Sequence, residues 1–114
     1  MSVKLNSRQV GDVNVVDVAG RITLGEGSSA LRDALRDMVT KNQKKILLNL
    51  ADVSYIDSSG IGELVSGFTT VTNNGGQLKL LNLTKRVKDL LQITKLYTVF
   101  DVHDDEAAAV RSFA

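Results

Sequence analysis

The sequence lacks the residues on which several kinds of protein chemistry depend. Its 114 residues include no cysteine, no proline, no tryptophan and a single histidine, His103. Without cysteine there can be no disulfide, thiolate-ligated zinc, iron–sulfur cluster or thiol catalysis. One histidine disfavours a histidine-rich metal centre and a Ser–His–Asp triad. The sequence therefore predicts a protein with no metal and no cofactor.

The chain also lacks a large excess of positive or negative charge and any long apolar run. Fourteen basic and thirteen acidic side chains give a net charge of +1, and aromatic residues make up 4% of the chain. This composition disfavours a nucleic-acid surface built on bulk charge or on base stacking. No apolar run is long enough for a membrane span or a signal peptide. We expect one cytoplasmic domain over residues 1–114, without direct contact to nucleic acid or membrane.

The first part of the chain has the pattern of a β-hairpin. Val3, Leu5 and Val10 are apolar, with Lys4, Asn6 and Arg8 between most of them, which is typical of a half-buried strand. Gly11-Asp12 then predicts a tight turn, because glycine tolerates positive backbone angles. The adjacent pair Val15-Val16 interrupts the alternation of the second strand, and it indicates either a bulge or a strand covered on both faces.

From Ser28 onward, apolar stripes at helical spacing alternate with short apolar runs typical of buried strands. Ser28 or Ser29 is the expected N-cap of the first helix. The order after the hairpin is helix, strand, helix, strand, helix, strand, helix, with apolar positions at 31–39, 46–50, 61–71, 78–83, 87–94, 99–102 and 109–113. This order predicts an α/β fold with a mixed, mostly parallel sheet of about five strands and with about four helices.

Two loops are candidates for function, 20–27 and 52–60, because ligands and partners of open α/β sheets gather where the strands end. Asp57, Ser58 and Ser59 are helix-capping residue types, so one interpretation of Asp57-Ser58-Ser59-Gly60 is simply the start of a helix. The other is that a serine here accepts phosphate. The positive end of a helix stabilises a phosphate dianion, and a phosphate there would disrupt a protein contact by repulsion and by the cost of its desolvation.

The segment 51–62, ADVSYIDSSGIG, follows the apolar run 46–50 and strongly resembles the signature of the anti-sigma-factor antagonist (STAS domain) family. The resemblance covers essentially the whole chain and includes 20–22, 76–78 and 87–91. It implies a non-enzymatic switch. In its unphosphorylated form such a protein binds an anti-sigma factor with serine kinase activity and so releases a sigma factor; phosphorylation breaks the complex, and a PP2C-type phosphatase restores it.

Carried onto this chain, the resemblance makes Ser58 the phosphate acceptor. Family members often carry an aspartate where this sequence has Thr23. We expect a monomer or a weak dimer, whose partner-binding residues are Thr23, Asp57, Ser58, Ser59, Gly60 and Ile61.

Other interpretations remain open at this point. The chain could be a STAS subunit of a larger signalling scaffold or of a lipid-transport assembly. It could also be an enzyme with Ser58 or Ser59 as nucleophile, for which His103 is the single available imidazole base. Lys85, Arg86 and Lys88 form a basic cluster that we interpret as a solvated helix face.

Overall fold

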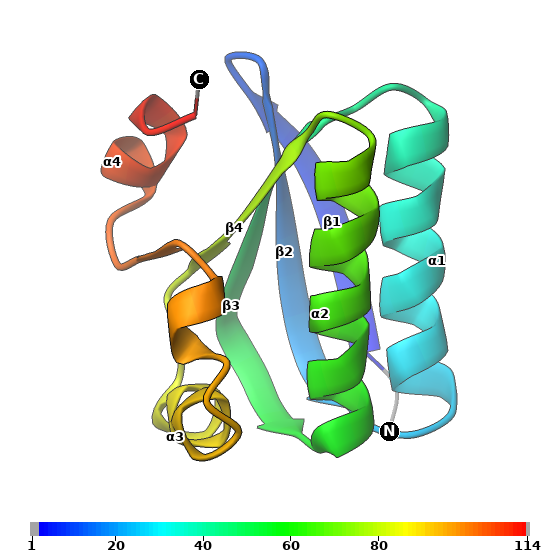
Figure 1. Ribbon diagram of the computed structural model, residues 1–114, viewed down its shortest axis with the longest axis vertical. Helices are drawn as coiled ribbons and strands as arrows, with labels where there is room; N and C mark the ends of the chain where they lie inside the picture. Colours follow the sequence, from blue (N-terminus) through cyan, green and yellow to red (C-terminus); the bar gives the residue numbers. More distant parts are fainter. Residues whose placement is uncertain (1–2, 114) are drawn as a thin grey trace.

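The computed structural model describes residues 3–113, which form a five-stranded sheet with helices on both faces (Figure 1). The strand order is β1-β2-β3-β4-β5, with β1 antiparallel to β2 and the other pairs parallel. This arrangement confirms the predicted fold class. The strands are β1 (Val3–Val10), β2 (Val13–Ile22), β3 (Lys45–Ile56), β4 (Gln77–Leu81) and β5 (Val102–His103). The helices are α1 (Glu26–Thr40), α2 (Ser58–Asn73), α3 (Lys85–Ile93) and α4 (Glu106–Arg111), with a 3-10 turn η1 (Tyr97–Val99).

The two long helices, α1 and α2, lie side by side on one face of the sheet (Figure 1). Leu31 and Leu35 of α1 and Leu64 of α2 are fully buried in one core cluster together with apolar residues of the central strand β3. The short helix α4 covers part of the opposite face, where Ala109 packs on Leu47. Apolar residues of β3 are therefore buried on both sides, which explains its continuous apolar run.

The hairpin forms as predicted, with Gly11 at a φ of +62° in the turn between β1 and β2. Residues 13–16 are all buried, so Val15-Val16 belongs to a strand covered on both faces. The irregularities in the pairing of β2 with β3 lie further along, between Asp17 and Ala19 and between Gly20 and Arg21.

The predicted N-cap of the first helix is wrong. Helix α1 begins at Glu26 and is preceded by Gly25, which has a φ of +99° and makes no side-chain cap. Ser28 lies inside the first turn, and its Oγ donates to the Thr23 carbonyl at 2.7 Å. Residues other than glycine rarely adopt the positive φ of Gly25. This backbone angle allows the helix to begin before Ser28 and Ser29, the expected caps.

The predicted strand at 99–102 is displaced toward the C-terminus. Residues 97–99 form η1, and the strand comprises Val102 and His103 only. The buried Phe100 ring packs edge-to-face on Phe68, with centroids 5.4 Å apart. This tertiary contact draws the segment toward α2, so its apolar residues serve packing rather than strand pairing.

Candidate functional site

The two candidate loops meet at the carboxyl ends of β2 and β3, and Asp57 joins them. Its carboxylate accepts from the Gly60 N–H at 2.9 Å and caps α2, while its second oxygen accepts from the Leu24 N–H at 3.0 Å. The Asp57 N–H in turn donates to the Ile22 carbonyl at 3.3 Å. One side chain thus starts a helix and holds the neighbouring loop in place.

The environment of Asp57 favours its ionised form. Partial burial tends to raise the pKa of the carboxyl, but donation from the backbone N–H groups of Gly60, Leu24 and Ser59 outweighs burial and holds that pKa below its ordinary value. At neutral pH the site therefore carries a fixed negative charge beside the first turn of α2.

Ser58 is the first residue of α2, and its side chain is exposed. In the described part of the chain its hydroxyl has no hydrogen-bond partner, so it projects freely from the positive end of a 16-residue helix. Ser59 is half-buried. Of the two serines, Ser58 is therefore the more accessible to another protein.

The remaining predicted partner-binding residues lie beneath or beside this surface. Gly60 and Ile61 are buried, so they lie beneath the surface rather than on it. A Cβ at Gly60 would lie 2.6 Å from Ile56 Cγ1 and would also clash with the Ile22 carbonyl oxygen, so only glycine fits there. Thr23 is half-buried and lies in the adjoining loop.

Sequence reasoning missed Leu24, whose side chain is 80% exposed although it is large and apolar. Its backbone is held by Asp57, so the exposed side chain lies next to the start of α2. The sequence does contain a hint: this leucine stands alone in the glycine-rich loop 20–27 and fits neither the apolar pattern of the preceding strand nor that of the following helix. Exposed apolar groups of this kind are typical of protein–protein contacts.

The structure does not bring His103 to either motif serine. Its Nε2 lies 3.0 Å from Asp101 Oδ2 and 3.4 Å from Ser112 Oγ, in a cluster that joins β5 to α4. Among the residues described, the hydrogen-bond partners of His103 are Asp101 and Ser112, and neither Ser58 nor Ser59 is one of them. The arrangement required for an activated serine nucleophile is therefore not assembled here.

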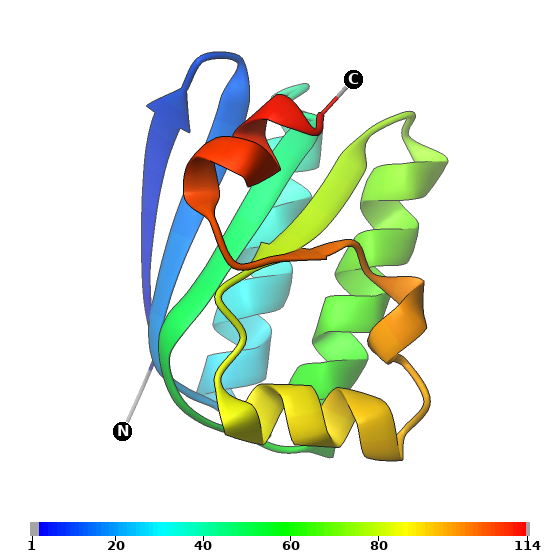
Figure 2. The ribbon, with the colours of Figure 1, turned by 90° about the vertical axis from the view of Figure 1, so that its left-hand side faces the viewer.

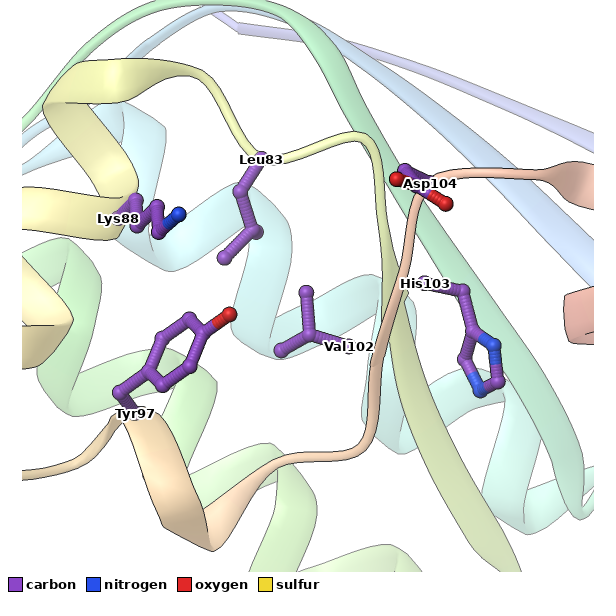
Figure 3. A pocket seen from close by; sticks show the side chains of 6 residues that line it. All are labelled: Leu83, Lys88, Tyr97, Val102, His103 and Asp104. Carbon is purple, nitrogen blue, oxygen red and sulfur yellow. The ribbon is translucent and has the colours of Figure 1, made fainter.

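A pocket of about 330 Å³ lies between α3, η1 and β5, apart from the acceptor loop. Figure 3 shows the Tyr97 hydroxyl and the Lys88 amine on the same side of this pocket, whereas the His103 ring lies on the other side of β5. Its polar groups do not converge on one point. Within residues 3–113, His, Asp and Glu side chains do not gather into a group that could hold a metal ion, and no helix is long and apolar enough to cross a membrane.

Comparison with known proteins bears on the family of this chain. Residues 4–109 match the STAS domain family. The chain is 33% identical over 102 residues to the anti-sigma-B factor antagonist of Bacillus subtilis strain 168, covering 90% of this chain and 92% of that protein. It is 26% identical over 106 residues to the anti-sigma-B factor antagonist of Listeria monocytogenes, covering 93% and 91%.

Solved structures share the fold at lower identity. An anti-sigma factor antagonist from Mycobacterium paratuberculosis has a TM-score of 0.86 at 17% identity, with 97% of this chain and 93% of that chain covered. The phosphorylated form of the Bacillus cell fate determinant SpoIIAA has a TM-score of 0.74 at 18% identity, with 95% and 97% covered. The match over residues 4–109, together with the one-third identity to a curated relative of nearly equal length, establishes that this chain belongs to the STAS domain family.

Proposed function

We propose that this protein is an anti-sigma factor antagonist, a binding switch that sequesters an anti-sigma factor while Ser58 is unphosphorylated and so frees a sigma factor. The observation that carries the proposal is the free, exposed hydroxyl of Ser58 at the start of α2, fixed beside the exposed Leu24 through Asp57. The names of the curated relatives, anti-sigma-B and anti-sigma F factor antagonists, support it.

The chemistry of the acceptor site supports a switch that leaves the fold intact. Transfer of the γ-phosphoryl group of ATP to Ser58 Oγ releases ADP and places a charge of about −1.5 to −2 at an exposed position. No core contact is lost, because the Ser58 side chain is exposed. A partner docked over this point would have to desolvate the phosphate next to the ionised Asp57. A loss of about 3 kcal/mol in binding free energy lowers the affinity on the order of a hundredfold.

The partner that fits this cycle is an anti-sigma factor that is itself a serine kinase, and a PP2C-type phosphatase would return the protein to its binding form. Docking would place Thr23, Asp57, Ser58 and Ser59 in the contact surface, with Gly60 and Ile61 holding the helix start from beneath.

Incubation with an anti-sigma kinase and ATP, followed by peptide mass spectrometry, tests the acceptor assignment. We expect one phosphate on Ser58 and none on Ser66, an exposed serine further along the same helix. The Ser58→Ala variant should bind the anti-sigma factor in the presence of ATP, whereas Ser58→Asp should bind poorly. Equal affinity of the two variants, or phosphate elsewhere with Ser58 unmodified, would contradict the proposal.

A further inference from the structure

A second group of side chains lies at the carboxyl edge of the sheet, outside the acceptor site. Arg21 near the end of β2 pairs in register with Tyr55 near the end of β3, and Arg86 lies in the first turn of α3. The guanidinium carbon of Arg86 is 4.5 Å from the centre of the Tyr55 ring, and that of Arg21 is 4.9 Å from it. We refer to these three residues as the Arg–Tyr–Arg cluster.

Within residues 3–113, neither arginine of the cluster has a counter-ion. Both are exposed, and in the described range 3–113 no carboxylate lies within ion-pair distance of either guanidinium. The adjacent Lys85, by contrast, pairs with Asp89 at 2.8 Å. Since both guanidinium groups approach one ring centre, the two cations are no further apart than about 10 Å, one Debye length at 0.1 M salt.

The geometry of the cluster leaves its hydrogen-bond donors available. A guanidinium stacked on an aromatic face is held through the ring, while its five N–H groups lie in its own plane and can bind a carboxylate with two parallel hydrogen bonds. The ring also limits the motion of both arginines, which reduces the entropy lost on binding. Two oriented cations without an internal partner are suited to an anionic group that comes from another molecule.

The cluster lies within reach of a protein that covers the acceptor serine. Tyr55 precedes Ser58 by three residues, so their Cα atoms are at most about 11 Å apart. An interface of ordinary size covers about 800 Å² on each partner, a patch roughly 16 Å in radius. Figures 1 and 2 both place the starts of α2 and α3 at the same end of the molecule.

We propose that the Arg–Tyr–Arg cluster is the basic half of the docking surface and that it binds carboxylates of an acidic segment on the protein partner. The inference rests on the proposed function, which it deepens by specifying the charge of the opposing surface. A protein segment is favoured over a nucleic acid because the chain has a net charge of only +1, whereas binding to a nucleic acid backbone neutralises many phosphates at once. The cluster would orient the partner and speed association.

Alanine variants of the two arginines test the proposal in the complex with the anti-sigma factor. Arg21→Ala and Arg86→Ala should each weaken binding by about five- to tenfold. The double variant should also reduce the dependence of affinity on salt concentration. Arg36→Ala removes a charge that is also exposed, from α1, and should bind like the parent protein. Binding of both cluster variants as tightly as Arg36→Ala, with an unchanged salt dependence, would overturn the proposal.

A second measurement separates this proposal from the proposed function. In an NMR titration with a hexaglutamate peptide, the side-chain Nε–Hε signals of Arg21 and Arg86 should shift while that of Arg36 does not. If they shift although no anti-sigma factor binds, the proposed function fails and the cluster remains an acidic-peptide site. If inorganic phosphate shifts them more than the peptide, or if all three arginines respond alike, the assignment to an acidic protein segment is wrong.

Discussion

Replacing Asp57 by alanine tests whether one carboxylate both starts α2 and holds the neighbouring loop. The change removes two hydrogen bonds, from the Gly60 N–H at 2.9 Å and from the Leu24 N–H at 3.0 Å. Loss of an N-cap costs about 1 kcal/mol. Loss of a hydrogen bond to a charged acceptor costs about 1.5 kcal/mol or more, and we use this lower value because Asp57 is only half-buried. We therefore expect the free energy of unfolding to fall by about 2–3 kcal/mol.

Urea unfolding followed by circular dichroism measures this difference, and two variants provide the scale. Thr84→Ala removes a single cap bond, from Val87 N–H at 3.3 Å, and should cost about 1 kcal/mol. Asp57→Asn keeps one acceptor oxygen and should lie between the parent protein and Asp57→Ala. The coupling of the two loops is refuted if Asp57→Ala costs no more than Thr84→Ala, because the bond to Leu24 would then contribute nothing.

The parent protein and Asp57→Asn should become more alike in stability in acid. The folded state lowers the pKa of Asp57, so its contribution to stability is fully present above the ordinary value of about 4. That contribution disappears as the pH falls through the lowered pKa of the folded protein. The difference in unfolding free energy between the parent protein and Asp57→Asn should therefore shrink below about pH 4. A difference that grows toward acid pH would show that the sign is wrong.

Three further substitutions test exposure and space at the same end of α2. Leu24→Ala should weaken binding of the anti-sigma factor about tenfold or more, because burying a leucine side chain contributes about 1.5–3 kcal/mol. Calorimetry measures this affinity. The control Ile93→Ala truncates a side chain that is 76% exposed at the end of α3 and should leave binding unchanged. Gly62→Ala should raise the free energy of unfolding by about 0.5–1 kcal/mol, because nothing lies within 4 Å of the added Cβ and alanine favours the helix. Gly60→Ala should lower it instead, since the added Cβ meets the Ile22 backbone, and a stable Gly60→Ala protein with unchanged binding would contradict the packing described here.

Much of the fold was determined by the local pattern of the sequence. The Gly11-Asp12 turn, the buried run at 46–50 and the helical stripe at 61–71 predict the hairpin, the central strand and α2, because periodicity and turn chemistry act over a few residues. The segment 51–62 also predicts which loop carries the candidate acceptor. The start of α1 at Glu26 depends on the positive φ of Gly25, which residue type alone does not reveal. The displacement of the last strand depends on the contact of Phe100 with the distant Phe68, which no local pattern contains.

The surface around Ser58 was decided by the tertiary structure. Sequence reasoning placed Gly60 and Ile61 among the contact residues and left out Leu24, yet the fold buries the first two and exposes the third. It also treated Arg86 as part of a solvated helix face. Whether a side chain faces a partner depends on which strands and helices end side by side, and Arg21, Tyr55 and Arg86 become neighbours only when β2, β3 and α3 meet at one edge of the sheet.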